Sequence, residues 1–149
     1  MKHTAEPGFE QRVRDSFARQ KVMATIGARL VRVAPGEVDV DVPVRADLTQ
    51  QHGFLHAGIT ATVLDSACGY AAFTLMPADA SVLSVEFKIN MLAPAKGERV
   101  VARARVKKSG RTISVCDADA YAVTGDSEKL VASMTGTMMC VRGREGVSG

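Results

Sequence analysis

The sequence predicts an α+β fold in which a mainly antiparallel β-sheet wraps around one long central helix, with an amphipathic helix near the N-terminus. Three features of the 149-residue sequence indicate this fold. Several segments alternate apolar and polar residues as strands do, residues 56–76 are apolar or small on every side, and no helical pattern separates the later strands. Parallel neighbours need long, usually helical crossovers, so we expect antiparallel pairing.

The first predicted element is a surface helix over residues 8–23. Phe9, Val13 and Phe17 recur every four residues and so share one helical face, while Glu10 and Arg14 form an i,i+4 pair on the other side. Residues 1–7 are polar and are expected to be disordered. They lack the apolar stretch of a secretory signal, so we expect a cytoplasmic protein.

The predicted strands form a hairpin and four later segments. In the hairpin, residues 28–44, valines alternate along the second half and Ala34-Pro35-Gly36 marks the turn. The later strands are residues 81–92, 98–108, 111–123 and 129–141. In the first of these, one face is expected to carry Leu83, Val85, Phe87, Ile89 and Met91. Residues 142–149 are expected to be disordered.

The central helix is predicted over residues 56–76, ending before Pro77. A helix that is apolar all round is expected to be buried all round, and its many Ala and Gly residues would let a sheet approach closely. A chain of this length is expected to form a single domain, residues 1–149.

Composition narrows the function classes. A net charge of +3 is too weak to imply nucleic-acid binding, and no apolar run reaches the length of a membrane span. Two groups of basic residues stand out, on one phase of a strand and in the tail: Arg99, Arg103, Arg105 and Lys107 with Lys108, and Arg142 with Arg144. A solvated strand face is the favoured interpretation, ahead of a site for the phosphates of coenzyme A.

The three cysteines, Cys68, Cys116 and Cys140, are odd in number, widely spaced and without a Cys-x-x-Cys pair. They are therefore expected to be buried, reduced thiols.

Asp65 is the only formally charged residue between Ala57 and Met76. A carboxylate in a buried helix costs several kcal/mol unless it is paired, faces a cleft or is protonated. One interpretation is structural, with the carboxylate held by neighbouring hydroxyls such as those of Thr62 or Ser66. The favoured one is a catalytic base or nucleophile in a cleft.

A polar loop, residues 50–58, leads into this helix. The first N–H groups of a helix lack internal partners and lie at the positive end of its dipole, so Ala57 or Gly58 can supply a donor to an oxyanion. His52 and His56 are four apart, but Gly53 makes a shared helical face improbable and no third ligand is evident, so no metal is expected. A Gly-x-Ser-x-Gly elbow and a glycine-rich phosphate loop are both absent.

The loop and helix resemble those of the PaaI-like hotdog thioesterases, which carry an Asn, a His-Gly-Gly at the helix start and an Asp eight residues after the first of those glycines. Here the corresponding residues are Gln50, His56-Ala57-Gly58 and Asp65. Ser84-Val85-Glu86 and residues 92–95 are similar as well, and the resemblance covers roughly residues 17–141. Gln51 is an alternative to Gln50 for the family Asn.

The resemblance implies hydrolysis of acyl-coenzyme A without a cofactor. Asp65 would activate water or attack the thioester, the Ala57 N–H would hold the carbonyl oxygen, and His56 would brace the loop. Gln50 would orient the water or the carbonyl, and Ser84 would assist near Asp65. The resemblance also implies homodimers that pair into homotetramers.

Helix geometry points to a shared site. Asp65 is eight residues beyond Ala57, and at 1.5 Å per residue these groups are about 12 Å apart along the helix. The two groups of one chain cannot both reach one thioester carbon, so a second chain must supply one of them.

Six residues are expected to contact substrate: Phe54, Gly58, Leu64, Tyr70, Phe73 and Met91. Apolar and aromatic side chains of this kind fit an aryl or an alkyl group equally. Two alternatives to hydrolysis stay open: hydration or dehydration of an acyl thioester, and non-catalytic binding of acyl-coenzyme A.

Overall fold

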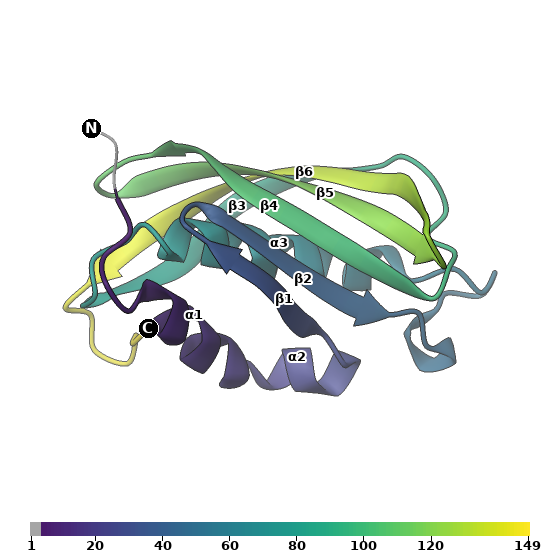
Figure 1. The fold of residues 1–149 in the computed structure, drawn as a ribbon, viewed down its shortest axis with the longest axis horizontal. Helices are drawn as coiled ribbons and strands as arrows, with labels where there is room; N and C mark the ends of the chain where they lie inside the picture. The colour runs from purple at the N-terminus through teal and green to yellow at the C-terminus, as the bar shows by residue number, and fades with distance from the viewer. Residues whose placement is uncertain (1–3) are drawn as a thin grey trace.

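The computed structural model describes residues 4–149, which form one six-stranded antiparallel sheet and a long helix that lies against it (Figure 1). The order of strands across the sheet is β1-β2-β4-β5-β6-β3. The elements are α1 (Phe9–Ala18), α2 (Lys21–Ile26), β1 (Arg29–Ala34), β2 (Glu37–Pro43), the short helix η1 (Ala46–Leu48), α3 (Ala57–Phe73), β3 (Ala80–Met91), β4 (Arg99–Ser109), β5 (Ile113–Thr124) and β6 (Ser127–Arg142).

The core lies between α3 and the concave face of the sheet, where α3 packs against β2, β3, β4, β5 and β6. Val38, Val40 and Val42 point inward and are fully buried, as the alternation predicts. Small residues allow the close approach: a Cβ on Gly136 would lie 2.9 Å from Met138 Cε and 3.7 Å from Cys68 Cβ. The predicted fold class, an antiparallel sheet wrapped around a central helix, is confirmed.

One prediction about α3 is wrong, because the helix is not buried on every side. Gly58 is exposed, and Ala61, Thr62 and Asp65 are partly exposed. These residues follow a spacing of three to four and form one stripe along the helix. The sheet covers the opposite side of α3, so this stripe is the side on which a ligand or a second chain has access to the helix.

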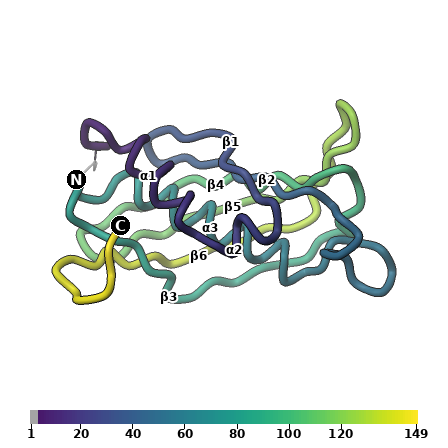
Figure 2. The backbone as a smooth tube through the Cα atoms, turned by 90° about the horizontal axis from the view of Figure 1, so that it is seen from below, coloured from purple at the N-terminus to yellow at the C-terminus, as the bar shows by residue number. Residues whose placement is uncertain are grey.

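The N-terminal helix also differs from the prediction. The single helix expected over residues 8–23 is two helices, α1 and α2, which meet at Arg19 and Gln20. Gln20 has an extended backbone, with φ −75° and ψ 96°, and this ends the helical run. Phe17 packs on Tyr70 of α3 with 5.7 Å between ring centroids. The two short helices lie below the sheet beside α3 (Figures 1 and 2).

Strand β3 forms the edge of the sheet and contains a β-bulge between Ser84 and Glu86. The bulge adds one residue, Val85, and so reverses the alternation along the strand. The prediction that all odd-numbered residues from 83 to 91 share one face is therefore wrong. Ser84 faces α3 on one side of the bulge, whereas on the other side it is Ile89 that packs against the core.

Residues near both ends of the chain contact the rest of the fold where the structure describes them. Residues 1–3 of the segment expected to be disordered lie outside the described residues, whereas Glu6 accepts a hydrogen bond from the Ala78 N–H. Beyond β6, residues 143–149 form no helix or strand, but they fold back beside α1 (Figure 2). The expectation of a disordered tail at 142–149 thus differs from the structure, in which Arg142 ends β6 and pairs with Asp79.

Candidate active site

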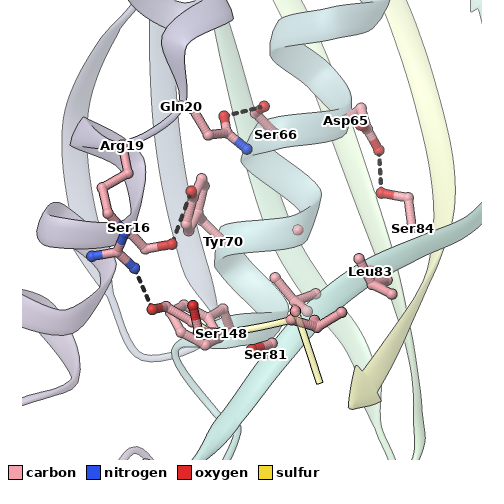
Figure 3. A pocket seen from close by; sticks show the side chains of 16 residues that line it. Ser16, Arg19, Gln20, Asp65, Ser66, Tyr70, Ser81, Leu83, Ser84 and Ser148 are labelled. Carbon is pink, nitrogen blue, oxygen red and sulfur yellow. Dashed lines mark hydrogen bonds between the residues drawn. The ribbon is translucent and has the colours of Figure 1, made fainter. Parts of the chain in front are cut away.

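Asp65 on α3 and Ser84 on β3 form a hydrogen-bonded pair (Figure 3). The Ser84 hydroxyl donates to Asp65 Oδ1 at 2.7 Å. The two hydroxyls named for the structural interpretation are not the partners of Asp65, because Thr62 donates to the Gly58 carbonyl and Ser66 donates to Gln20. Among residues 4–149 only Ser84 hydrogen-bonds Asp65, so the carboxylate keeps acceptor capacity for a ligand or water.

The pair lies in a cavity of about 380 Å³ between α3, β3 and the junction of α1 and α2 (Figure 3). The predicted pocket residues Tyr70 and Phe73 line it. Tyr70 shares a hydrogen bond of 3.2 Å with Ser16, and burial raises the pKa of the tyrosine hydroxyl. The volume is within the range of small-molecule sites.

Several other residues of this cavity have no distinguishing signal in the sequence. Arg19 and Gln20 enter it because the chain is not helical between α1 and α2, and Gly146 to Gly149 enter it from the tail. A break in a helical pattern without Pro or Gly has no distinct sequence signature, and the tail carries no hydrophobic period.

The loop before α3 is built around Gln50. The Gln50 N–H donates to the Phe54 carbonyl at 2.9 Å, and the Gln50 carbonyl accepts from the Gly53 N–H at 3.0 Å. The Gln50 side-chain oxygen accepts from the N–H groups of His52 and Phe54. The Gln50 amide NH₂ has no partner among the described residues. Gln51 is exposed and does not line a cavity with Ala57, so the loop presents Gln50 to the helix start.

His56 caps the start of α3. Its Nδ1 accepts a hydrogen bond of 2.8 Å from the Gly58 N–H, which requires the Nε2–H tautomer when the ring is neutral. Of the two oxyanion donors that the sequence leaves open, Gly58 is thus occupied within the chain. The Ala57 N–H has no partner among residues 4–149 and is the available donor.

A second cavity, of about 430 Å³, lies at this end of the helix and is lined by Gln50, Phe54, Ala57 and Met91, among others. Two predicted contact residues lie in neither cavity. Leu64 is fully buried in the core because it faces the sheet, and Gly58 lies on the exposed stripe of α3. The predicted site residues that line a cavity therefore divide into two groups, one at each cavity, and one chain does not bring Asp65 and Ala57 together.

The basic residues of β4 mostly pair with carboxylates. Arg103 binds Glu128, Lys107 lies 3.3 Å from Asp117, and Arg99 lies 3.6 Å from the buried Asp41. Each of these ion pairs neutralises a positive charge that would otherwise attract a phosphate. This favours the interpretation of the basic residues of β4 as a charged strand face.

Other chemistry finds little support in the part of the chain that the structure describes. No group of three or more His, Cys, Asp or Glu residues there is arranged to hold a metal ion. No helix among residues 4–149 is long and apolar enough to cross a bilayer. Cys68 and Cys116 are buried free thiols, as predicted, and Cys140 is half-buried.

The curved antiparallel sheet around a single long helix defines the hotdog fold. A family model described as the thioesterase superfamily matches residues 52–129, which is more than half of the sequence. The chain belongs to this superfamily. The resemblance to PaaI-like hotdog thioesterases drawn from the loop and helix is thereby confirmed.

Three relatives illustrate the match. The crystal structure of a thioesterase family protein from Silicibacter pomeroyi is 59% identical, with TM-score 0.90, and covers 91% of this chain and 100% of that one. The PaaI protein of E. coli, 20% identical over 94% and 95% of the two chains with TM-score 0.80, shares the fold. Human acyl-coenzyme A thioesterase 13 is 36% identical over 60% of this chain and 64% of its own, so the chain spans slightly under two thirds of that relative.

Proposed function

We propose that this protein hydrolyses acyl-coenzyme A thioesters to a free acid and coenzyme A, with Asp65 as the group that activates water or attacks the thioester. The observation that carries the proposal is the position of Asp65. It is the one carboxylate on an otherwise small and apolar helix, it lines a ligand-sized cavity, and it is held by Ser84 alone among the described residues. The membership of the thioesterase superfamily supports the same chemistry.

The proposed site is shared between two subunits. Asp65 and the Ala57 N–H lie at different cavities of one chain, about 12 Å apart along the helix. An isologous dimer, in which each surface patch contacts its own copy, would bring Ala57 of one helix to Asp65 of the other at two equivalent places.

The edge strand β3 is the surface that favours this dimer. It leaves large apolar side chains exposed: Leu83, Val85, Phe87 and Met91 have relative exposures of 41%, 53%, 43% and 46%. An exposed apolar edge strand is a surface that soluble proteins normally cover. Pairing of two β3 edges beside the α3 stripes would cover both, and we propose that such dimers pair further into tetramers.

In the proposed reaction, Asp65 takes a proton from a water molecule, whose oxygen attacks the carbonyl carbon of the thioester. The carbonyl oxygen becomes an oxyanion that accepts hydrogen bonds from the Ala57 N–H and the Gln50 amide. The intermediate then expels the coenzyme A thiolate, which takes the proton from Asp65. The alternative within the same proposal is direct attack by Asp65, which expels the coenzyme A thiolate and forms a mixed anhydride that water then cleaves to the free acid and the Asp65 carboxylate.

The test is release of free coenzyme A, followed with a thiol reagent, on acyl-coenzyme A substrates with short, medium, long and aromatic acyl groups. Asp65→Ala should lower turnover of the best substrate by roughly 10²- to 10⁴-fold and leave the fold intact. Near wild-type turnover in this variant, or no coenzyme A release by the wild type, would refute the proposal. Binding without release would instead indicate a non-catalytic acyl-coenzyme A binding protein.

The role of Asp65 as base or nucleophile can be separated by one turnover in H₂¹⁸O with enzyme in excess. A general base leads to ¹⁸O only in the released acid. A nucleophile leads to ¹⁸O in the Asp65 carboxylate when water cleaves the anhydride at the enzyme side, which mass spectrometry of the peptide detects.

Subunit sharing is tested by mixing two inactive variants. Ala57→Pro removes the proposed oxyanion donor at a first-turn position that otherwise tolerates proline. When it is unfolded and refolded with Asp65→Ala, half of the dimers are mixed and half of their sites are intact, so about a quarter of wild-type activity should return. Activity no higher than the mean of the separately refolded variants, with mixed dimers demonstrated, would contradict a shared site.

A further inference from the structure

The tail of the chain forms part of the lining of the Asp65 cavity. Gly146, Val147, Ser148 and Gly149 line the cavity together with Phe73. Arg19, at the junction of α1 and α2, donates a hydrogen bond to the Gly149 carbonyl (Figure 3). The tail is thus connected to the same junction that supplies Gln20 to the cavity.

The tail reaches this position because the backbone turns twice after β6. Gly143 and Gly146 have φ values of 63° and 77°, which favour glycine, and the Val147 N–H donates to the Arg144 carbonyl at 3.2 Å. The Arg142 side chain binds Asp79 at 2.7 Å and fixes the end of β6. The fold-back is therefore specified by short-range geometry and not by apolar burial alone.

The contact between the tail and the cavity end is close. A Cβ added to Gly149 would lie 2.6 Å from the Ala80 carbonyl oxygen and 2.8 Å from Phe73 Cζ. The tail backbone consequently packs directly on the Phe73 ring and on the start of β3. No space for a further acyl segment remains between them.

We propose that residues 144–149 form the end wall of the acyl cavity and limit the length of the acyl group, with Arg19 as the positioning residue that holds the wall. This inference rests on the proposed function. Phe73 is eight residues beyond Asp65, so the cavity extends about 12 Å along α3 before it meets the tail. A fully extended dodecanoyl chain is longer than this, whereas a butyryl chain fits with room to spare.

The experiment compares kcat/KM for butyryl- and dodecanoyl-coenzyme A in the full chain and in a chain that stops at Gly143. Removal of the wall should raise the dodecanoyl-to-butyryl ratio by roughly tenfold or more, the gain expected from burying about two further methylene groups. An unchanged ratio in a truncated protein that keeps its melting temperature and oligomeric state would overturn the proposal.

Point variants test the proposed end wall without truncation, and they provide the test if the truncated chain does not fold. Gly146→Val strains a left-handed turn that positions the tail. Gly125→Val is the matched control, because Gly125 has φ 55° in the β5–β6 turn and, like Gly146, has open space around it. Arg19→Ala removes the anchor, and Arg14→Ala removes a neighbouring exposed arginine that pairs with Glu10. The dodecanoyl-to-butyryl ratio of kcat/KM should rise in Gly146→Val and Arg19→Ala and stay unchanged in their controls. If each variant has the same ratio as its control, the proposal of an end wall is refuted.

A binding measurement separates this inference from the proposed function. Calorimetry with dodecanoate below its micelle concentration needs no turnover, and the truncated chain should bind it at least about tenfold more tightly than the full chain, with butanoate as the reference ligand. Failure of the wild type to release coenzyme A would refute the hydrolase alone. Equal dodecanoate affinity in both chains would refute the wall alone.

Discussion

The Ser84 hydroxyl donates to the Asp65 carboxylate at 2.7 Å and so joins the central helix to the edge strand of the sheet. Serine at this position also contacts the Met138 sulfur at 3.5 Å, which restricts its rotamer. Because no other side chain among residues 4–149 hydrogen-bonds Asp65, the direction of the carboxylate depends on this one contact.

Replacement of Ser84 by alanine is expected to lower kcat by up to about 10²-fold with little change in KM, because the carboxylate loses its orientation and not its chemistry. Steady-state kinetics on the best acyl-coenzyme A measures this. Ser133→Ala is the matched control, since Ser133 makes the same 2.7 Å contact with Asp119 away from the cavity. The same kcat and KM in Ser84→Ala and Ser133→Ala would show that Ser84 has no role in catalysis.

The two neighbouring glutamines are expected to differ sharply. Gln50 lines the cavity at Ala57 and its oxygen holds the loop, whereas Gln51 is exposed. Gln50→Ala should therefore reduce kcat by about 10²-fold, as loss of one oxyanion donor does, while Gln51→Ala stays within about twofold of wild type. The reverse order would assign the family Asn role to Gln51.

His56 is expected to contribute to stability through its cap. His56→Ala removes the acceptor of the Gly58 N–H and should lower the free energy of unfolding by roughly 1 kcal/mol, measured by urea titration. His56→Asn should recover most of that loss, since asparagine is a good N-cap residue. An alanine variant as stable as wild type would show that the cap has no net effect.

Most of the fold could be predicted because its signals are local. Alternating valines in β2 indicate which face of that strand is buried, and the long apolar run indicates that α3 is the helix of the core, although not which of its sides stays exposed. The break at Gln20 and the bulge in β3 could not be predicted, because both arise from packing between segments distant in sequence.

The site was only partly accessible to sequence reasoning for a similar reason. Asp65 stood out as a lone charge in an apolar helix, and Ala57 as a residue at a helix start. Leu64 was misplaced because an apolar residue on such a helix can face the sheet or a cavity equally well by composition. Arg19 and the tail became part of the cavity only through the tertiary fold.

The cysteines are expected to differ in reactivity. Burial raises the pKa of the Cys116 thiol to about 12 and raises that of Cys68 as well, so at pH 8 only about 10⁻⁴ of Cys116 is thiolate. A disulfide reagent should modify Cys140 first in the native protein and all three thiols after unfolding. Rapid native labelling of Cys68 or Cys116, located by peptide mass spectrometry, would contradict the burial.

The raised pKa of the Cys116 thiol also makes the stability of the protein depend on pH. An unfolded thiol ionises near pH ~8.5 and folded Cys116 near 12, so unfolding releases a proton in this window and the contribution of the thiol to stability is lost as pH rises through it. Cys116→Ala should show a smaller loss of stability between pH 8 and pH 10 than wild type, measured as urea midpoints.

The proposed dimer is expected to depend on the edge strand β3. Val85→Lys places a charge on a bulged residue that is 53% exposed, and it should convert dimers to monomers in sedimentation and abolish turnover with them. Val31→Lys is the control, because Val31 is 51% exposed at the bulge of the opposite edge strand, β1. Retention of the dimer in the first variant would place the interface elsewhere.

The bulge in β3 means that the direction of Ser84 depends on how β3 pairs with β6 and not only on which residues the strand contains. Without the bulge, and with β3 still held from Ile89 onward, Val85 would take the place opposite Met138 and Ser84 would turn to the outer face. A shift in pairing of one residue, with every functional side chain still present, would thus take the hydroxyl away from the carboxylate. Related chains that carry both residues but pair this strand without the bulge are accordingly expected to lack the contact.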